Sequence, residues 1–132
     1  MRFFSLPALL FALPAVCVRV SYDTIYDNPA KPLTEVACSD GDNGFLQYGY
    51  KTVSDLPNFP YIGGAQEVGG WNSPACGVCF NMTYNGTALY VTAIDHSATG
   101  FNIAHYAMDS LTGFRASALG VVDAEANRHC GT

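Results

Sequence analysis

The sequence predicts a mainly β domain held together by disulfides, and three observations support this prediction. Turn-forming dipeptides recur at short intervals, as in proteins built from many short strands. Residues 79–94 show strand-like patterns on either side of an Asn-Gly pair, which is typical of a hairpin. An even number of cysteines follows the N-terminal segment, as in small disulfide-bonded domains. The turn dipeptides are Asn28-Pro29, Asp40-Gly41, Asn43-Gly44, Gly63-Gly64, Gly69-Gly70 and Asn85-Gly86.

The N-terminal residues have the pattern of a secretory signal peptide. Arg2 gives a positive start, and residues 3–16 form an apolar stretch. This stretch is too short for a membrane span, and two prolines within it argue against the alternative of a buried N-terminal helix. We expect cleavage after Cys17 and a secreted protein. Residues 1–17 are therefore assigned to the signal peptide, and residues 18–132 to one domain.

The chain is acidic, with 11 Asp and Glu residues against 6 Lys and Arg residues and a net charge of −5. Removal of the signal peptide also removes Arg2, which increases the acidic excess. Because no basic patch remains, we expect neither nucleic acid nor a membrane as a partner. No motif for a cofactor is present, and none is expected.

Strands are predicted in order along the chain at Val18–Tyr22, around Val36, at Cys79–Tyr84, at Ala88–Ile94 and at Leu119–Val122. The best defined pair is the hairpin of the third and fourth strands. Cys79–Tyr84 alternates apolar and polar residues, and Ala88–Ile94 has the composition of a buried strand. Asn85-Gly86 between them is the preferred dipeptide of a type I′ turn.

One helix is predicted at Ala104–Leu111, where apolar residues follow helical spacing and Gly113 provides a C-terminal stop. A second short helix is expected near Ser54. Two sequons, at Asn81 and Asn85, are candidate glycosylation sites in a secreted chain. Asn81 should face away from the apolar side of its strand, and Asn85 should lie at the tip of the turn.

Four cysteines follow the predicted signal peptide: Cys38, Cys76, Cys79 and Cys130. They allow two disulfides in three pairings, and the residues alone do not choose among them. The two pairings that enclose long loops would each stabilise by about 3–4 kcal/mol in the chain-entropy model. The Cys76–Cys79 stretch, CGVC, also has the form of a redox or zinc half-site. It lacks a strand–helix context and a second metal-spaced pair.

Several spaced motifs of the chain resemble those of the cerato-platanins, small secreted proteins of filamentous fungi. The motifs are VSYDTIYD (20–27), VACSDGDNG (36–44), IGGA (62–65), GWNSPACGVC (70–79), AIDH (93–96), GFNIA (100–104) and the closing CG (130–131). The resemblance implies a six-stranded double-ψ β-barrel with disulfides Cys38–Cys76 and Cys79–Cys130. The run between Asp123 and Cys130 is shorter than in the family, which leaves the length of the last strand open.

The resemblance also implies a function. Cerato-platanins bind chitin-type N-acetylglucosamine oligomers in a shallow groove, elicit plant defence and assemble at air–water interfaces. The expected partners are therefore chitin oligomers and a receptor at the plant surface. The fold is shared with expansins and with certain inverting endoglucanases, which makes an enzyme or a wall-loosening factor the first alternative.

Residues 91–104 carry the predicted centre of the groove. Asp95 follows an apolar strand, and Asn102 occupies the position that an acid takes in the expansin and endoglucanase relatives. Inverting glycoside hydrolysis needs two carboxyl groups, and an amide has no acidic proton to donate. We therefore expect a non-catalytic site. The alternatives are a helix N-cap for Asn102 and a loop-capping role for Asp95. His96 is expected to be solvated, and no metal site is expected.

The second wall of the groove is predicted in residues 39–44. Gly41 allows close backbone approach, and Asp42 and Asn43 offer hydrogen-bonding groups. The alternative is an ordinary solvated turn. Tyr22 and Tyr26 are the aromatic candidates for the groove, whereas Trp71 is expected to be half-buried. The leading interpretation is a secreted, non-catalytic carbohydrate-binding protein. The alternatives are expansin-like loosening of polysaccharides and a surface-active, self-assembling structural protein.

Overall fold

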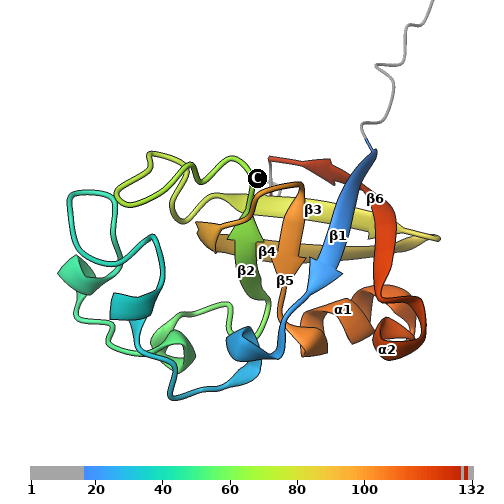
Figure 1. The fold of residues 1–132 in the computed structure, drawn as a ribbon, viewed down its shortest axis with the longest axis horizontal. Coiled ribbons are helices and arrows are strands. Elements are labelled where there is room, and N and C mark those ends of the chain that lie inside the picture. Colours follow the sequence, from blue (N-terminus) through green and yellow to red (C-terminus); the bar gives the residue numbers. More distant parts are fainter. Residues whose placement is uncertain (1–16, 129, 131–132) are drawn as a thin grey trace, which may run out of the picture.

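The computed structural model describes residues 17–128 and Cys130. Six strands close into a barrel in the order β1-β5-β2-β4-β3-β6 (Figure 1). The strands are β1 (Cys17–Tyr22), β2 (Ile62–Ala65), β3 (Cys79–Tyr84), β4 (Thr87–His96), β5 (Phe101–Ile103) and β6 (Val121–Asn127). The helices are α1 (His105–Thr112) and α2 (Ala116–Leu119), with short 3₁₀ turns η1 (Thr24–Asp27), η2 (Leu33–Glu35), η3 (Leu46–Tyr48) and η4 (Val53–Asp55).

The expected six-stranded barrel is confirmed. Two strand pairs are parallel, β1 with β5 and β2 with β4, and the other neighbours are antiparallel. Parallel neighbours need long crossover connections, so strands far apart in the sequence lie side by side. The segment between β1 and β2 extends to one side of the barrel, and α1 and α2 lie at its other end (Figure 1). The disulfides are Cys38–Cys76 and Cys79–Cys130.

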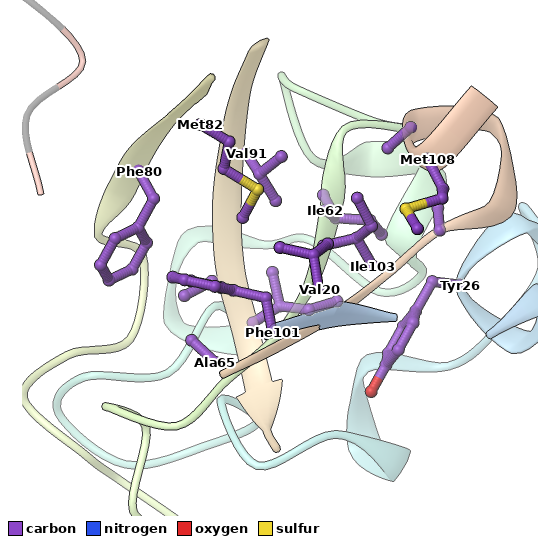
Figure 2. Packing of buried hydrophobic residues seen from close by; sticks show 14 of the residues in the cluster. Val20, Tyr26, Ile62, Ala65, Phe80, Met82, Val91, Phe101, Ile103 and Met108 are labelled. Carbon is purple, nitrogen blue, oxygen red and sulfur yellow. The ribbon is translucent and has the colours of Figure 1, made fainter. Parts of the chain in front are cut away.

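The barrel core is filled by alternate residues of each strand, because successive strand residues point to opposite faces. Phe80 and Met82 of β3 face the same cluster as Ile103 of β5 (Figure 2). The rings of Phe80 and Phe101 meet edge to face with centroids 4.8 Å apart. Helix α1 adds Met108 to this cluster (Figure 2), so the helix closes one part of the core.

The predicted hairpin and helix are confirmed. The hairpin comprises β3 and β4, and α1 ends at Thr112, followed by the C-cap residue Gly113, whose left-handed φ of 71° suits glycine. The short helix near Ser54 is the 3₁₀ turn η4. No helix of residues 17–128 has the length and apolar character needed to span a membrane.

Two strand predictions need correction. Val36 is not in a strand: it is the C-cap residue that follows η2, and its apolar character reflects burial in the core. Leu119 ends α2, so the last strand begins at Val121 rather than at Leu119. That strand is not lost in the short C-terminal run, because β6 continues to Asn127 and pairs with both β1 and β3. The predicted signal peptide lies outside the described residues except for Cys17, which begins β1.

Candidate functional site

A row of polar residues crosses four neighbouring strands on the outer face of the barrel. Asp95 of β4 pairs with Gly64 of β2, Gly64 pairs with Asn102 of β5, and Asn102 pairs with Ser21 of β1. Directly paired residues share one face of a sheet. Asp95 and Asn102 therefore stand about 10 Å apart, twice the strand spacing of roughly 4.8 Å. Gly64 itself is buried, and a Cβ at this position would lie 2.8 Å from the carbonyl oxygen of His96, so glycine is needed between them. We call Asp95, Gly64, Asn102 and Ser21 the polar row.

A β-bulge places Asp95 in this row. Gly63 pairs with Ala93, but the next residue, Gly64, pairs with Asp95, so Ile94 is the extra residue on β4. Ala93 and Ile94 are both buried, whereas Asp95 is partly exposed. Bulges commonly redirect a side chain in this way. Without the extra residue, the alternation of the strand would leave the acid out of register with its neighbours.

The carboxylate of Asp95 accepts three hydrogen bonds. The hydroxyl of Tyr26 donates to Oδ2 at 2.8 Å, and the backbone N–H groups of Ala37 and His96 donate to Oδ1 at 2.9 Å each. Burial, and then the negative charge of Asp95, raises the pKa of Tyr26 well above its ordinary value, so its hydroxyl remains a donor. Asp95 therefore has the loop-capping contacts of the alternative interpretation, and these contacts also fix its orientation in the polar row.

Asn102 is not a helix N-cap, because it lies within β5 and pairs with strands on both sides. Its Oδ1 accepts a hydrogen bond from Ser21 Oγ at 3.0 Å. The Nδ2 group makes no hydrogen bond among the described residues, so both of its N–H donors are available to a ligand. The N-cap position of α1 is Ala104, which has no side-chain oxygen to act as a cap.

Asp27 of η1 supplies the cap that Ala104 lacks. Its two carboxylate oxygens accept hydrogen bonds from the backbone N–H groups of His105 and Tyr106, at 2.7 and 2.9 Å. A carboxylate at this position satisfies unpaired helix donors and interacts favourably with the helix dipole. The contact also ties η1, which carries Tyr26, to the helix that follows β5.

Replacing Asp27 by alanine is expected to lower the free energy of unfolding by about 1–2 kcal/mol, as for other lost helix caps. Urea unfolding followed by circular dichroism measures this change. Asp123→Ala is the matched control, because Asp123 is exposed on β6 and makes no side-chain hydrogen bond among the described residues. Equal stability of the two variants would show that Asp27 is not a functional cap.

His96 is held beside the polar row rather than left free. Its Nδ1 lies 2.7 Å from the carbonyl oxygen of Val68. A carbonyl can only accept, so Nδ1 carries the proton and Nε2 is left for other contacts. No group of three His, Cys, Asp or Glu side chains within residues 17–128 is arranged to hold a metal ion.

The 39–44 loop bonds mainly to the segment around Asn72. The backbone N–H and side-chain Nδ2 of Asn43 donate to Oδ1 and O of Asn72, at 2.9 and 3.0 Å. Gly41 has a φ of 88°, and a Cβ there would lie 2.7 Å from Asn72 Oδ1, so glycine is needed. Asp42 is exposed, and its carbonyl accepts a bond from Gln47.

The structure links the start of this loop to the polar row but does not bring the whole predicted site together. Cys38 N–H donates to the carbonyl of Ile94, directly before Asp95. No hydrogen bond among the described residues joins Asp42 or Asn43 to the polar row. Tyr22 packs edge-on against the ring of His105, with centroids 4.7 Å apart. The groove roles of Gly41, Asp42, Asn43 and Tyr22 remain predictions.

Trp71 is more exposed than expected: 62% of its surface is accessible. Its indole N–H donates to Asp40 Oδ1 at 2.6 Å, and this bond holds the pKa of the Asp40 carboxyl below its ordinary value of 3.8. A depressed pKa in the folded state means that the contact persists above the ordinary Asp pKa and is lost as the pH falls through the lowered value.

We therefore expect an acid transition in the fluorescence of Trp71, the only tryptophan of the chain, with a midpoint below pH 3.8. Fluorescence titration measures it directly. The matched variant Asp40→Asn should lack the transition, because an amide does not titrate. A transition that persists in this variant would mean that another group controls the indole.

Two members of the polar row, Ser21 and Gly64, are missing from the sequence-based prediction. Ser21 lies between buried Val20 and partly buried Tyr22, so strand alternation could have indicated that it faces outward. Gly64 had no such signal, because a Gly-Gly pair is typical of a turn rather than a strand.

Comparison with known proteins gives the same family at the levels of sequence and structure. The family model described as Cerato-platanin matches residues 18–131. The "Heat-stable 19 kDa antigen" of Coccidioides posadasii is 55% identical over 101 residues, covering 76% of this chain and 69% of that protein.

Solved structures of cerato-platanins match the fold of this chain. Cerato-platanin 1 from M. perniciosa superposes with a TM-score of 0.81 at 46% identity, over 85% of this chain and 94% of that one. The solution structure of the fungal elicitor Cerato-Platanin gives a TM-score of 0.75 at 37% identity, over 85% and 92% of the two chains. The chain belongs to the cerato-platanin family.

Proposed function

We propose that this protein is a secreted, non-catalytic carbohydrate-binding protein that holds chitin-type N-acetylglucosamine oligomers across the polar row. One observation carries the proposal. Asp95 and Asn102 lie on either side of Gly64 in the polar row, both are partly exposed, and the bulge at Ile94 and the bonds from Tyr26 and Ser21 fix their orientation. A site of this kind is preorganised, which lowers the entropic cost of binding.

The chemistry of the row suits a sugar that carries hydroxyl and N-acetyl groups. Asn102 Nδ2 provides free donors, and Asp95 provides acceptor oxygens, with its charge already stabilised by three donors. Each ligand hydrogen bond should contribute about 0.5–1.5 kcal/mol. The affinity should be modest, because a shallow site buries much less of its ligand than a deep pocket.

Hydrolysis does not fit this row. Inverting hydrolases place two carboxyl groups on either side of the scissile bond, whereas here one position is an amide and the other a carboxylate held by three donors. The test is co-sedimentation with insoluble chitin beside a reducing-sugar assay on chitin and cellulose. Saturable binding without sugar release supports the proposal. Release that Asp95→Asn abolishes would replace it with an enzyme.

An elicitor role is part of the proposal, since a solved relative is described as a fungal elicitor. A plant-surface receptor would then be a second partner besides the oligosaccharide. Applying the purified protein and its Asn102→Ala variant to plant leaves tests whether the receptor and the oligosaccharide use the same site. A defence response to both proteins would mean that the receptor does not recognise the polar row.

A surface-active structural role is the second candidate, and exposed aromatic side chains favour it. Phe114 is 86% exposed and Trp71 is 62% exposed. Large exposed apolar groups can adsorb at an air–water interface. Surface-tension measurements on the wild type and Phe114→Ser test this candidate, which requires lower surface activity in the variant.

The two glycosylation candidates differ in exposure, and we propose that Asn85 is the modified one. Asn85 is exposed at the hairpin tip, whereas Asn81 lies within β3 between Tyr90 and Asn127, and its Oδ1 is buried. In a secreting, glycosylating host we expect Asn85→Gln to abolish the glycan mass and Asn81→Gln to leave it unchanged. Mass spectrometry of the two variants measures the glycan on each. Loss of the glycan in Asn81→Gln but not in Asn85→Gln would contradict the expectation.

A further inference from the structure

Two adjoining cavities lie away from the polar row and share one residue, Asn58. The first has a volume of about 320 Å³ and is lined by three aromatic rings, those of Phe45, Tyr48 and Tyr50. The second, of about 420 Å³, is lined by Tyr61 and Tyr90 among others. Asn58 lines both. Volumes of this size are at the lower end of the range for small-molecule sites.

The walls of the first cavity are fixed by covalent and backbone contacts. Phe45 N–H donates to the carbonyl of Cys38, and Gly77 follows Cys76, so the Cys38–Cys76 disulfide holds two of its walls together. The rings of Tyr48 and Tyr50 lie 6.2 Å apart and are tilted by 47°. The cavity is therefore formed before any ligand arrives.

Polar atoms that make no hydrogen bond to the described residues lie beside these rings. Asn58 Nδ2 donates to the carbonyl of Tyr61 at 3.0 Å and to Thr92 Oγ1 at 3.1 Å, with a longer contact to the carbonyl of Tyr90. Its Oδ1 accepts no hydrogen bond among the described residues, and the hydroxyls of Tyr48 and Tyr50 make none. These groups could bond to hydroxyl groups on a ligand.

Within the described part of the chain, no charged residue lines either cavity, although the whole chain carries a net charge of −5. An ionic ligand would find no partner there, and burying its charge without one would be costly. Aromatic faces next to free hydroxyl and amide groups suit a neutral ring with an apolar face and a polar edge. Two such cavities in succession suit two linked rings.

We propose that these cavities form a second oligosaccharide subsite, which takes two adjacent neutral pyranose units with Asn58 between them. The proposal rests on the carbohydrate-binding function proposed above and extends it to a second region of the surface. A proline-rich peptide also packs on aromatic rings, but it needs a long continuous groove rather than two compact cavities.

The subsite is separate from the polar row. Both use β4, which contributes Thr92 to the first cavity and Asp95 to the row. Two other segments bond to β4 between Thr92 and Asp95. Gly77 N–H donates to the carbonyl of Ala93, and Cys38 N–H donates to the carbonyl of Ile94. A long oligomer could occupy both regions only by passing over these segments.

The test is calorimetric titration of the full chain with a chitin hexamer, using Tyr48→Ala and the matched aromatic control Phe114→Ala. Tyr48 is 67% exposed and Phe114 is 86% exposed, so both variants should fold. We expect Tyr48→Ala to weaken binding about fivefold, the loss of one ring contact, and Phe114→Ala to leave it unchanged. Sugar should also perturb the ring signals of Tyr48 and Tyr50 in NMR spectra.

The outcomes separate this inference from the proposed function. If Asn102→Ala weakens binding while Tyr48→Ala does not, and the tyrosine signals stay unchanged, the second subsite is overturned and the polar row stands. If the wild type does not bind the hexamer at all, both are overturned. Perturbation of the tyrosine signals by a polyproline peptide but not by sugar would overturn the subsite in favour of peptide recognition.

Discussion

Replacing Cys38 and Cys76 together by alanine is expected to lower the free energy of unfolding by about 4 kcal/mol. The two cysteines are separated by 38 residues, and closing a loop of this length removes about that much entropy from the unfolded chain. The folded state should also suffer, because the bridge ties the start of the 39–44 loop to the segment before β3. Guanidinium unfolding of the double variant measures the loss.

The control for this variant is Asp123→Ala. Asp123 is exposed on β6 and makes no side-chain hydrogen bond among the described residues, so its replacement should change stability by less than about 0.5 kcal/mol. If the double variant lost no more than this control, the Cys38–Cys76 bridge would not contribute to folding stability, and the preformed walls of the first cavity would need another explanation.

Replacing Asp95 by alanine is expected to cost about 3 kcal/mol of folding stability. Three donors lose their acceptor, and one of them is the hydroxyl of Tyr26, a residue that is only 3% exposed. An unsatisfied buried donor costs about 1–3 kcal/mol. The loss should exceed that of a surface acid such as Asp123, because Asp95 connects three separate segments of the chain.

Asp95→Asn should cost less, about 1 kcal/mol. The amide oxygen can still accept from the N–H groups of Ala37 and His96, and the Tyr26 hydroxyl can turn to accept from the amide nitrogen. Urea unfolding of the two Asp95 variants measures the difference. If Asp95→Ala were as stable as Asp95→Asn, the carboxylate would not organise these segments.

Local patterns predicted the local elements of the fold. The β3–β4 hairpin follows from its alternation and the Asn-Gly turn, and α1 follows from apolar spacing and Gly113. Strands β2 and β5 escaped prediction because they are only four and three residues long, and they are formed by pairing with distant strands rather than by their own propensity. The closed barrel was expected from family resemblance, not from these patterns.

The candidate site was likewise only partly predictable from the sequence. Asp95 and Asn102 were chosen from the sequence, but their pairing through Gly64 depends on the bulge at Ile94, which has no local signal. The cap of α1 could not be predicted either, because Asp27 lies 78 residues before His105 in the chain. Contacts of this kind are set by the tertiary fold, so sequence periodicity carries no information about them.

The central claim is that the polar row binds chitin-type oligosaccharides, and one calorimetric comparison tests it most directly. The full chain, Asn102→Ala and the matched control Asn127→Ala are titrated with a chitin hexamer; Asn127 is exposed on β6 and outside the row. We predict saturable binding that weakens about fivefold in Asn102→Ala, since one or two hydrogen bonds are lost, and is unchanged in the control. Equal affinity of all three proteins would contradict the claim.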